Sequence, residues 1–165
     1  MKILVVSDTH GYGEILEEIV KKENPIDVLI HCGDIEGQED QIVSWAGCRT
    51  FMVSGNNDWG SDLPGQFFTS VGGCRIFATH GHRYQVYMGI DRLAAEAAKR
   101  GADICLFGHT HMPLIAEKNG VTVMNPGSLT YPRQEGRKPS YGIITGDKES
   151  GFSCEIRYVD KHSKT

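Results

Sequence analysis

Short apolar runs alternate with helical patterns along the first third of the chain. The runs at 2–7, 27–33 and 50–55 are continuous and rich in β-branched residues, which is typical of strands buried on both faces. Between them, apolar residues recur at helical spacing over 11–23 and 36–46. This alternation of strand and helix predicts parallel strands joined by right-handed crossovers.

Turn signals separate the elements of the remaining chain. Gly72-Gly73 and Asn119-Gly120 are two-residue hairpin signals. The expected elements are strands at 67–71, 74–80, 103–108, 140–145 and 152–159, a hairpin over 113–125, and a helix from Tyr84 to Arg100 capped by Gly101. We therefore predict an α/β fold with a mixed sheet in the first half and antiparallel strands in the second. So many strands favour two sheets packed face to face, flanked by helices.

The composition narrows the class of protein. With 165 residues, 39% hydrophobic and 23% charged, the chain suits a single globular domain spanning 1–165. A net charge of -4 and the absence of a basic cluster argue against long nucleic acid as a partner. The apolar run Ile3–Val6 is too short for a signal peptide, and no run is long enough to span a membrane. We expect a cytoplasmic protein without a membrane partner, and the sequence leaves homo-oligomers open.

Cysteine usage excludes two further classes of site. The five cysteines form no C-x-x-C pair and are odd in number. A disulfide framework and a cysteine-ligated zinc site are therefore not expected. Cys32 and Cys105 lie in apolar runs and are predicted to be small core residues.

Polar clusters directly follow five of the expected strands. The clusters are Ser7–His10, Gly33-Asp34, Gly55–Asp58, His80–His82 and Gly108–His111. Ligands of open α/β sheets bind at the carboxyl ends of the strands, so we expect these five clusters to converge on one site. Five of the seven histidines belong to them. Each cluster alone is a common loop sequence, but five together at strand ends favour a metal site.

The residue types define the metal chemistry. Side chains two apart in an extended segment point the same way, so Asp8 and His10 can bind one ion together. Histidine suits transition metals and Asp and Asn oxygens accept harder ions, which favours manganese, iron, zinc or nickel. The candidate ligands are Asp8, His10, Asp34, Asn56, His80, His109 and His111. Seven ligands exceed the need of one four-coordinate ion, so we predict two ions bridged by Asp34.

The two other histidines are expected to have structural roles. His31 lies inside an apolar run and is predicted to be a hydrogen-bonded core residue. His162 lies in the charged C-terminal tail and is expected to be solvated.

At these clusters the sequence resembles the calcineurin-like metallophosphoesterase family. The motifs are "SDTH", "CGDIE", "SGNND", "THGH" and "FGHTH" in this order, and "NPGSLTYPR" at 125–133 is similar to its small bacterial and archaeal phosphodiesterases. The resemblance implies a four-layer α/β/β/α sandwich with two mixed sheets. It assigns one ion to Asp8, His10, Asp34 and His111 and the other to Asp34, Asn56, His80 and His109. Family members of this kind typically use manganese, with nickel, iron or zinc also found.

The chain departs from the family pattern after the Gly-Asn motif. Larger members carry a histidine there that is thought to protonate the leaving group, whereas this chain has Asn57. An amide donates a hydrogen bond but does not readily supply a proton. The chain is therefore expected either to favour good leaving groups or to use His82 or a metal-bound water as the acid. Candidate phosphate contacts are Arg133 and the backbone and hydroxyl of Gly127-Ser128, with a surface salt bridge as the alternative for Arg133.

The sequence therefore predicts a two-metal phosphodiesterase acting on small phosphodiesters. Two ions hold a water, lower its pKa and neutralise phosphate oxygens, so that hydroxide attacks phosphorus in line. A phosphomonoesterase or nuclease on the same site is the first alternative. A catalytically silent, protein-binding scaffold of the same fold is the second, and it predicts broken ligand positions, which the chain does not have.

Overall fold

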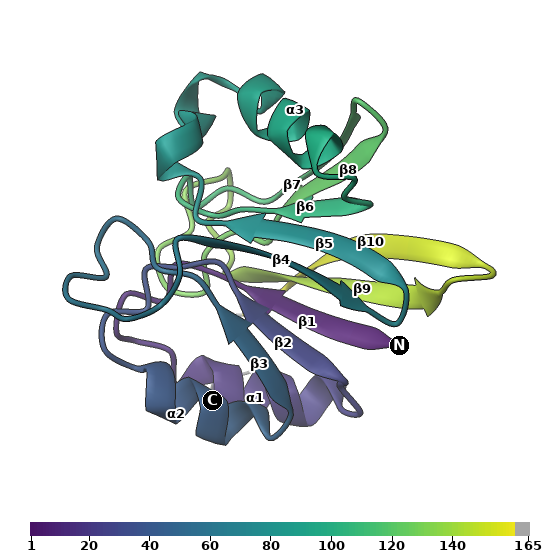
Figure 1. Cartoon of the computed structure of the whole chain (residues 1–165). Helices are drawn as coiled ribbons and strands as arrows, with labels where there is room; N and C mark the ends of the chain where they lie inside the picture. The colour runs from purple at the N-terminus through teal and green to yellow at the C-terminus, as the bar shows by residue number, and fades with distance from the viewer. Residues whose placement is uncertain (161–165) are drawn as a thin grey trace.

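The computed structural model describes residues 1–160, arranged as two β-sheets between helices (Figure 1), and His162 lies outside the described residues. The first sheet contains β1 (Lys2–Val6), β2 (Val28–His31), β3 (Arg49–Met52), β9 (Ser140–Asp147) and β10 (Gly151–Tyr158). The second contains β4 (Gln66–Val71), β5 (Cys74–Thr79), β6 (Ile104–Leu106), β7 (Leu114–Lys118) and β8 (Val121–Asn125). The α-helices are α1 (Ile15–Glu23), α2 (Glu39–Ala46) and α3 (Asp91–Lys99).

Both sheets are mixed, as the family resemblance implied. In the first sheet, ordered β10-β9-β1-β2-β3, strands β1, β2 and β3 are parallel and β9 and β10 are antiparallel. In the second, ordered β4-β5-β6-β8-β7, the central strands β5, β6 and β8 are parallel. The prediction of antiparallel strands in the second half of the chain is therefore wrong for the pairings of β6 with β5 and β8. The connection from β5 to β6 carries α3 as a crossover, and a crossover brings the next strand in parallel.

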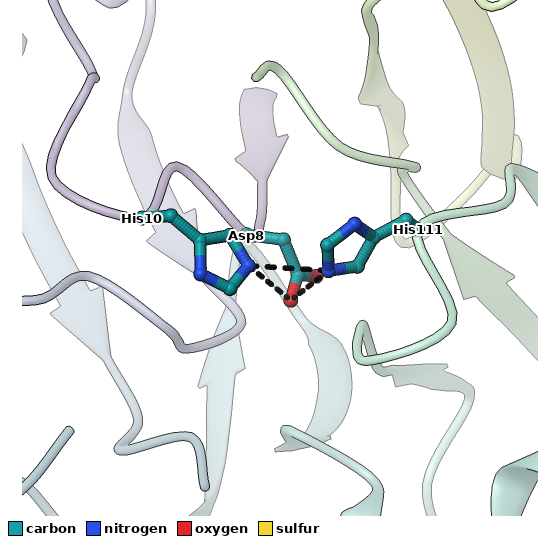
Figure 2. Close-up of side chains that lie close together, drawn as sticks. All are labelled: Asp8, His10 and His111. Atoms are coloured by element: carbon teal, nitrogen blue, oxygen red, sulfur yellow. Dashed lines mark hydrogen bonds and ion pairs between the residues drawn. The ribbon is translucent and has the colours of Figure 1, made fainter. Parts of the chain in front are cut away.

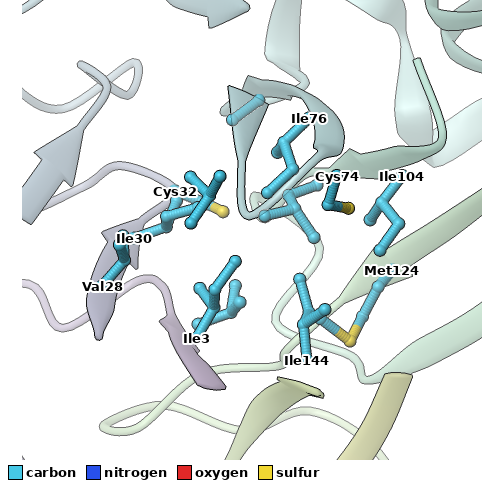
Figure 3. Packing of buried hydrophobic residues seen from close by; sticks show 13 residues of the cluster. Ile3, Val28, Ile30, Cys32, Cys74, Ile76, Ile104, Met124 and Ile144 are labelled. Carbon is cyan, nitrogen blue, oxygen red and sulfur yellow. The ribbon is translucent and has the colours of Figure 1, made fainter. Parts of the chain in front are cut away.

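Three apolar clusters hold the four layers together. One lies between the sheets, where Ile3 and Ile30 of the first sheet pack with Ile76 and Met124 of the second (Figure 3). A second joins the opposite face of the first sheet to α1 and α2, and a third joins the second sheet to α3. Because the inner strands β1, β2 and β6 are buried on both faces, they are continuous apolar runs, whereas the edge strands β4 and β10 alternate between more buried and more exposed positions. The four-layer α/β/β/α sandwich is thus confirmed.

The helices begin later than the periodicity predicts. The predicted helix from Tyr84 is replaced at its start by two 3₁₀ turns, His82–Tyr84 and Val86–Met88, before α3 begins. Gln85 and Gly89 have φ angles of 53° and 122°, which no α-helix accommodates. Left-handed residues likewise delay the other two helices, at Gly11 before α1 and at Glu36-Gly37 before α2. The residues that were predicted as helical but precede α1, α2 and α3 instead form loops that connect the strands to the helices.

The cysteine expectation agrees with the structure. All five cysteines are free, and Cys32 and Cys105 are fully buried in the apolar clusters. Within residues 1–160, no helix combines the length and apolar character needed to cross a membrane.

Candidate metal centre

The register of the strands brings the polar clusters together. Val6 of β1 pairs with His31 of β2, so the loops that leave these strands run side by side. The Asp8 amide then donates to the Gly33 carbonyl at 3.0 Å, and the His10 amide donates to the Asp34 carbonyl at 2.9 Å. The predicted convergence of the first two clusters therefore follows from the parallel pairing of β1 and β2.

The second sheet delivers its histidines to the same place. Ala78 of β5 pairs with Leu106 of β6, and beyond them the Gly108 amide donates to the His80 carbonyl at 3.0 Å. The His109 amide donates to Asp8 Oδ2 at 3.0 Å, which ties the two sheets together across the site. The loops involved gather at one end of the sandwich, at the left of Figure 1.

The backbone of the candidate ligands is strained. Five of the predicted ligands have positive φ angles between 48° and 71°, namely Asp8, His10, Asp34, His109 and His111. A left-handed conformation is uncommon for residues other than glycine, and such strain clusters at functional sites. The side chains are therefore directed by the surrounding fold rather than by local preference.

Two glycines make room for the converging loops. A Cβ atom at Gly108 would overlap the Ser7 hydroxyl and lie 2.6 Å from Asp8 Oδ2. A Cβ atom at Gly33, which has a φ of 105°, would lie 2.7 Å from His80 Nδ1. Glycine is needed at both positions because the backbone approaches the site directly.

One group of ligand atoms forms around Asp8. Asp8 Oδ1 lies 3.3 Å from His111 Nε2 and 3.7 Å from His10 Nε2, and the two imidazole nitrogens are 3.1 Å apart (Figure 2). Figure 2 shows both rings pointing their nitrogens at the carboxylate from opposite loops. One carboxylate oxygen and two imidazole nitrogens at this spacing are suited to a shared transition-metal ion.

A second group forms around Asp34 and His80. His80 Nε2 lies 3.3 Å from Asp34 Oδ2 and 3.8 Å from Asp8 Oδ1, while His109 Nδ1 lies 3.3 Å from His80 Nε2. Asp34 Oδ2 is also 3.7 Å from His10 Nε2. Asp34 therefore faces histidines of both groups, which is the placement expected of a bridging carboxylate.

Two of the imidazoles are oriented by backbone carbonyls. His80 Nδ1 lies 2.8 Å from the Cys32 carbonyl, and His111 Nδ1 lies 2.8 Å from the Tyr131 carbonyl. A carbonyl accepts a hydrogen bond from Nδ1–H, and this contact turns Nε2 of each ring toward the carboxylates. Metal-ligating histidines are typically oriented by such contacts.

Asp8 Oδ1 tests whether these residues fit a metal. The side chain of Asp8 is fully buried, and its Oδ2 accepts from the Ser7 hydroxyl and the His109 amide. Oδ1 is also buried yet receives no hydrogen bond from a described residue. A buried carboxylate oxygen without a donor is costly, and a divalent cation would satisfy it. The donor set therefore fits a metal ion.

The electrostatics of the cluster agree with a cation site. Burial acts to raise the pKa of Asp8, but contacts with His10 and His111 and the charge of His80 outweigh it and lower the pKa. Burial is likewise outweighed at Asp34, mainly by His80, and its pKa falls to about 2. Burial and then the charge of His80 lower the pKa of His109 to about 4. At neutral pH the site thus offers two carboxylates together with a neutral His109.

The two asparagines after β3 take different positions. Asn57 donates to both oxygens of Asp34, from its backbone amide at 2.9 Å and from its side-chain amide at 3.0 Å. Asn56 is exposed, and no hydrogen bond within residues 1–160 ties it to the other predicted ligands. The structure therefore brings six of the seven predicted ligands together and leaves the role of Asn56 as a prediction.

The other predicted site residues lie around the cluster. His82 has its ring 5.5 Å from that of His80, and its buried Nδ1 has no hydrogen-bond partner among the described residues. Arg133 is exposed and donates from Nη1 to the Tyr87 hydroxyl at 2.6 Å, and its backbone amide donates to the His111 carbonyl. His82 thus lies beside His80 and His109, whereas Arg133 reaches the cluster through Tyr87 and the His111 backbone.

The placement of Ser128 differs from the expectation that its hydroxyl contacts phosphate. Ser128 is fully buried, and its hydroxyl donates to the Asp8 carbonyl at 2.7 Å. The same oxygen accepts from the backbone amides of Thr130 and Tyr131. A hydroxyl with these partners has no open side for a substrate, so Ser128 holds the 128–131 loop against the first ligand loop. His31, by contrast, is a hydrogen-bonded core residue as expected, with Thr9 and Gly33 as partners.

Sequence analysis did not identify Asp58 as important. Its carboxylate accepts four backbone amides at 2.7–2.8 Å, from Asp34, Ile35, Glu36 and Gly55. It thereby fixes the loop that carries Asp34 to the loop after β3. The signal available in the sequence was the position of Asp58, three residues after Gly55 at the end of one strand, while the end of the neighbouring strand carries Gly33-Asp34.

The fold and the site define a metal-dependent phosphoesterase class, and comparison with known proteins agrees. Residues 1–149 match the model of the calcineurin-like phosphoesterase superfamily domain. The chain is 32% identical over 164 residues to the probable metallophosphoesterase YsnB of Bacillus subtilis, covering 98% of this chain and 92% of that protein. The chain therefore belongs to the calcineurin-like metallophosphoesterase family, as the motifs indicated.

Two further proteins, one with a known structure and one named as a phosphodiesterase, are similar to this chain. A crystal structure of a predicted phosphoesterase from Streptococcus pneumoniae TIGR4 matches with a TM-score of 0.83 and 30% identity, over 95% of this chain and 88% of that one. The phosphodiesterase MJ0936 of Methanocaldococcus jannaschii is 30% identical over 149 residues, covering 77% of this chain and 83% of that protein.

Proposed function

We propose that the protein is a two-metal phosphodiesterase that hydrolyses small phosphodiesters, with manganese as its metal. The single observation that carries the proposal is the buried cluster of Asp8, Asp34 and four imidazoles, in which a carboxylate oxygen lacks a donor. Asp8, His10, Asp34 and His111 would hold one ion, and Asp34, Asn56, His80 and His109 the other. When bound, such ions act as Lewis acids that activate water and neutralise phosphoryl charge.

The protein residues would position the substrate. Arg133 lies on the groove that contains His10 and His111, and it makes no ion pair with any carboxylate of residues 1–160. Its guanidinium is thus available for a phosphate oxygen, and the Tyr87 hydroxyl holds it in place from the other side. The Tyr87 ring packs edge-on against His109, which links Arg133 to the histidine cluster.

Diesters with good leaving groups are the substrates that this site favours. Asn57 stands where larger relatives carry a histidine, and both of its amide N–H groups that contact the site are directed at Asp34. An amide bound in this way supplies no proton to a departing alkoxide. His82 is the remaining candidate acid, because its Nδ1 lacks a hydrogen-bond partner within the described residues.

An assay of metal dependence tests the proposal. The metal-free protein is reloaded with Mn²⁺, Ni²⁺, Fe²⁺ or Zn²⁺, and hydrolysis of bis(p-nitrophenyl) phosphate and p-nitrophenyl phosphate is compared. We expect turnover of the diester to require a divalent metal, to be fastest with manganese and to exceed turnover of the monoester. A preference for the monoester would instead favour a phosphomonoesterase. A folded protein that binds metal and hydrolyses neither ester would favour a scaffold.

A substitution at position 57 tests the leaving-group argument separately. Asn57→His supplies a titratable group where the amide now stands. We expect hydrolysis of esters with poor leaving groups to rise relative to nitrophenyl esters. An unchanged ratio would show that proton supply does not limit the reaction.

A further inference from the structure

A groove leads away from the metal centre on the side of His10 and His111. Its inner part, of about 530 Å³, is lined by these two histidines and by Tyr131, Arg133 and Arg137. Its outer part, of about 930 Å³, shares Tyr131 and Arg137 with the inner part, so the two are continuous. Pockets of this size hold whole small-molecule ligands, whereas a phosphate group alone would fill a small part of the space.

Two exposed tyrosines form the aromatic part of the groove. Tyr12 is 62% exposed and Tyr131 is 49% exposed, and their rings are perpendicular with centroids 6.4 Å apart. The Tyr131 ring also lies 5.5 Å from the ring of His10, next to the metal centre. Exposed aromatic faces bind planar groups by stacking. The rings of Tyr12 and Tyr131 thus form an aromatic platform in the groove, and the Tyr131 ring is next to the candidate metal ligand His10.

Hydrogen bonds hold this platform in place. The Thr130 hydroxyl donates to the carbonyls of Thr9 and Tyr12 at 2.9 and 3.3 Å, which joins the two tyrosine loops. His111 Nδ1 contacts the Tyr131 carbonyl at 2.8 Å. A platform that is ordered before the ligand arrives loses less entropy on binding. The backbone that carries the two tyrosines is therefore held close to the metal centre.

Charge changes sign along the groove. Arg133 lines the part beside the histidines, Glu14 and Glu18 line the outer part, and Arg137 lies where the two parts meet. A phosphate is attracted to the inner end and repelled from the outer end. Carboxylates accept hydrogen bonds from hydroxyl and amino groups, so the outer end suits a neutral group rich in donors. An alkyl chain would contact apolar residues of the outer part such as Ile15, Leu129 and Val159, but it would offer no donor to the carboxylates.

From this arrangement we infer that the substrate carries a nucleoside on one ester arm of its phosphodiester. The base packs between Tyr131 and Tyr12, face-on to one ring and edge-on to the other, because the two rings are perpendicular. Hydroxyl or amino groups of the nucleoside reach Glu14 and Glu18. The inference rests on the proposed phosphodiesterase function and names the substrate class of that same site.

Two substrates with the same leaving group test this inference. Thymidine 5′-(p-nitrophenyl phosphate) and methyl p-nitrophenyl phosphate differ in the second ester arm alone. With the manganese-loaded protein, we expect KM for the thymidine ester to be about tenfold lower, the size of effect that stacking of one base produces. Equal KM values for the two esters would overturn the inference.

Matched variants assign the effect to the groove. Tyr131→Leu and Tyr12→Leu are expected to bring the ratio of the two KM values towards one. Tyr158→Leu is the control, because Tyr158 is also 49% exposed but lies on β10 and does not line the groove. A ratio that falls equally in Tyr158→Leu, or that stays unchanged in both groove variants, would contradict the role of the platform.

Binding without turnover gives an independent readout. Calorimetric titration of the manganese-loaded protein with thymidine 5′-monophosphate and with methyl phosphate removes the nitrophenyl group from the comparison. We expect the nucleotide to bind about tenfold more tightly to the wild-type protein and with a smaller advantage to Tyr131→Leu. Hydrolysis of both esters without any preference in KM or binding would overturn the nucleoside assignment and leave the phosphodiesterase proposal standing. Hydrolysis of neither would overturn both.

Discussion

Two buried acidic clusters in this protein are built on opposite principles. Glu23, at the end of α1, is 2% exposed and its carboxylate is fully supplied with donors. The Tyr141 hydroxyl donates to Oε2 at 2.5 Å, Arg157 donates to Oε1, and Lys2 Nζ lies 3.2 Å from Oε1. This cluster ties α1 to β1, β9 and β10 and is neutralised by the protein itself.

The cluster around Asp8 and Asp34 has no such balance. Within the described residues, no lysine or arginine pairs with either carboxylate, and the neighbouring groups are imidazoles. Asp8 Oδ1 receives no hydrogen bond, although it is buried. The fold supplies Tyr, Arg and Lys to the carboxylate of Glu23 but histidines to the carboxylates of Asp8 and Asp34. The negative charge of Asp8 and Asp34 is therefore left to be balanced by a cation. A buried carboxylate is thus structural at Glu23 and a candidate metal ligand at Asp8 and Asp34, because the neighbouring side chains differ.

The largest expected effect comes from breaking the unbalanced cluster. Asp34→Asn removes the proposed bridging charge, so we expect diester hydrolysis to fall more than about a hundredfold, beyond the loss typical of residues that merely orient a ligand. Mn²⁺ at 100 times its dissociation constant should stabilise the wild-type protein by about 2.7 kcal/mol. This stabilisation should vanish in Asp34→Asn. The measurement is the melting temperature with Mn²⁺ and with EDTA.

Glu23→Gln is the counterpart of that experiment in the balanced cluster. Its Tm should still rise on addition of Mn²⁺, because the change lies in the other acidic cluster. If Mn²⁺ stabilised Asp34→Asn as strongly as the wild-type protein, the contrast between the two clusters would be wrong.

Asp58 should produce the next largest effect. It resembles Glu23 in being fully supplied with donors, yet it holds the loop that carries Asp34. Asp58→Asn places an NH₂ group against backbone amides, so we expect affinity for Mn²⁺ to fall 10- to 100-fold, as for other residues that orient ligands. Titration of Mn²⁺ followed by Tm measures this affinity.

Asp62→Asn is the matched control for Asp58. Asp62 lies in the same loop and is exposed. Its substitution should leave Mn²⁺ affinity within twofold of the wild-type value. Equal losses in both variants would show that loop charge, rather than the amide contacts of Asp58, sets the affinity.

Glu23→Gln should lower stability without changing the chemistry. Breaking a buried pair costs about 3–5 kcal/mol, but Arg157 and Lys2 are partly exposed, so we expect the free energy of unfolding to fall by about 2 kcal/mol. Urea denaturation measures the loss. Glu17→Gln is the control, since the Glu17–Lys21 pair on the same helix is exposed and should contribute little. A loss of activity per folded molecule in Glu23→Gln would contradict the separation of the two clusters.

Sequence predicted those parts of the fold that depend on local pattern. The continuous apolar runs identified β1, β2 and β6 because strands buried on both faces have no polar positions. The parallel pairing of β5 and β6 was missed although the predicted helix between them was a crossover signal, whereas the parallel pairing of β6 and β8 has no such helix to indicate it. The start of α3 was missed because Gln85 adopts a left-handed conformation, which its residue type does not indicate.

The candidate site was predictable to the extent that it is made of side chains at strand ends. Six of the seven predicted ligands converge, because the register of parallel strands places consecutive strand ends together. Asp58 and Ser128 were not predicted correctly, since their roles consist of contacts with backbone groups far away in the sequence. The aromatic groove was also missed, because Tyr12 and Tyr131 meet across loops whose arrangement the sequence does not encode locally.

The smallest expected effect is the pH dependence of the balanced cluster. Burial acts to raise the pKa of Glu23, but hydrogen bonds from Tyr141, Arg157 and Lys2 outweigh it and lower the pKa below the usual value of a glutamate side chain. A carboxyl with a depressed folded-state pKa stabilises the protein above its unfolded pKa, and this contribution disappears as the pH falls through the folded value. The difference in unfolding free energy between wild type and Glu23→Gln, measured in EDTA, should therefore be constant from about pH 8 to pH 5 and shrink below about pH 4.5. If this difference in unfolding free energy shrank near pH 6.5 instead, a histidine would be the titrating group. The stability contributed by Glu23 would then depend on the histidine-rich cluster, which contradicts the separation of the two clusters.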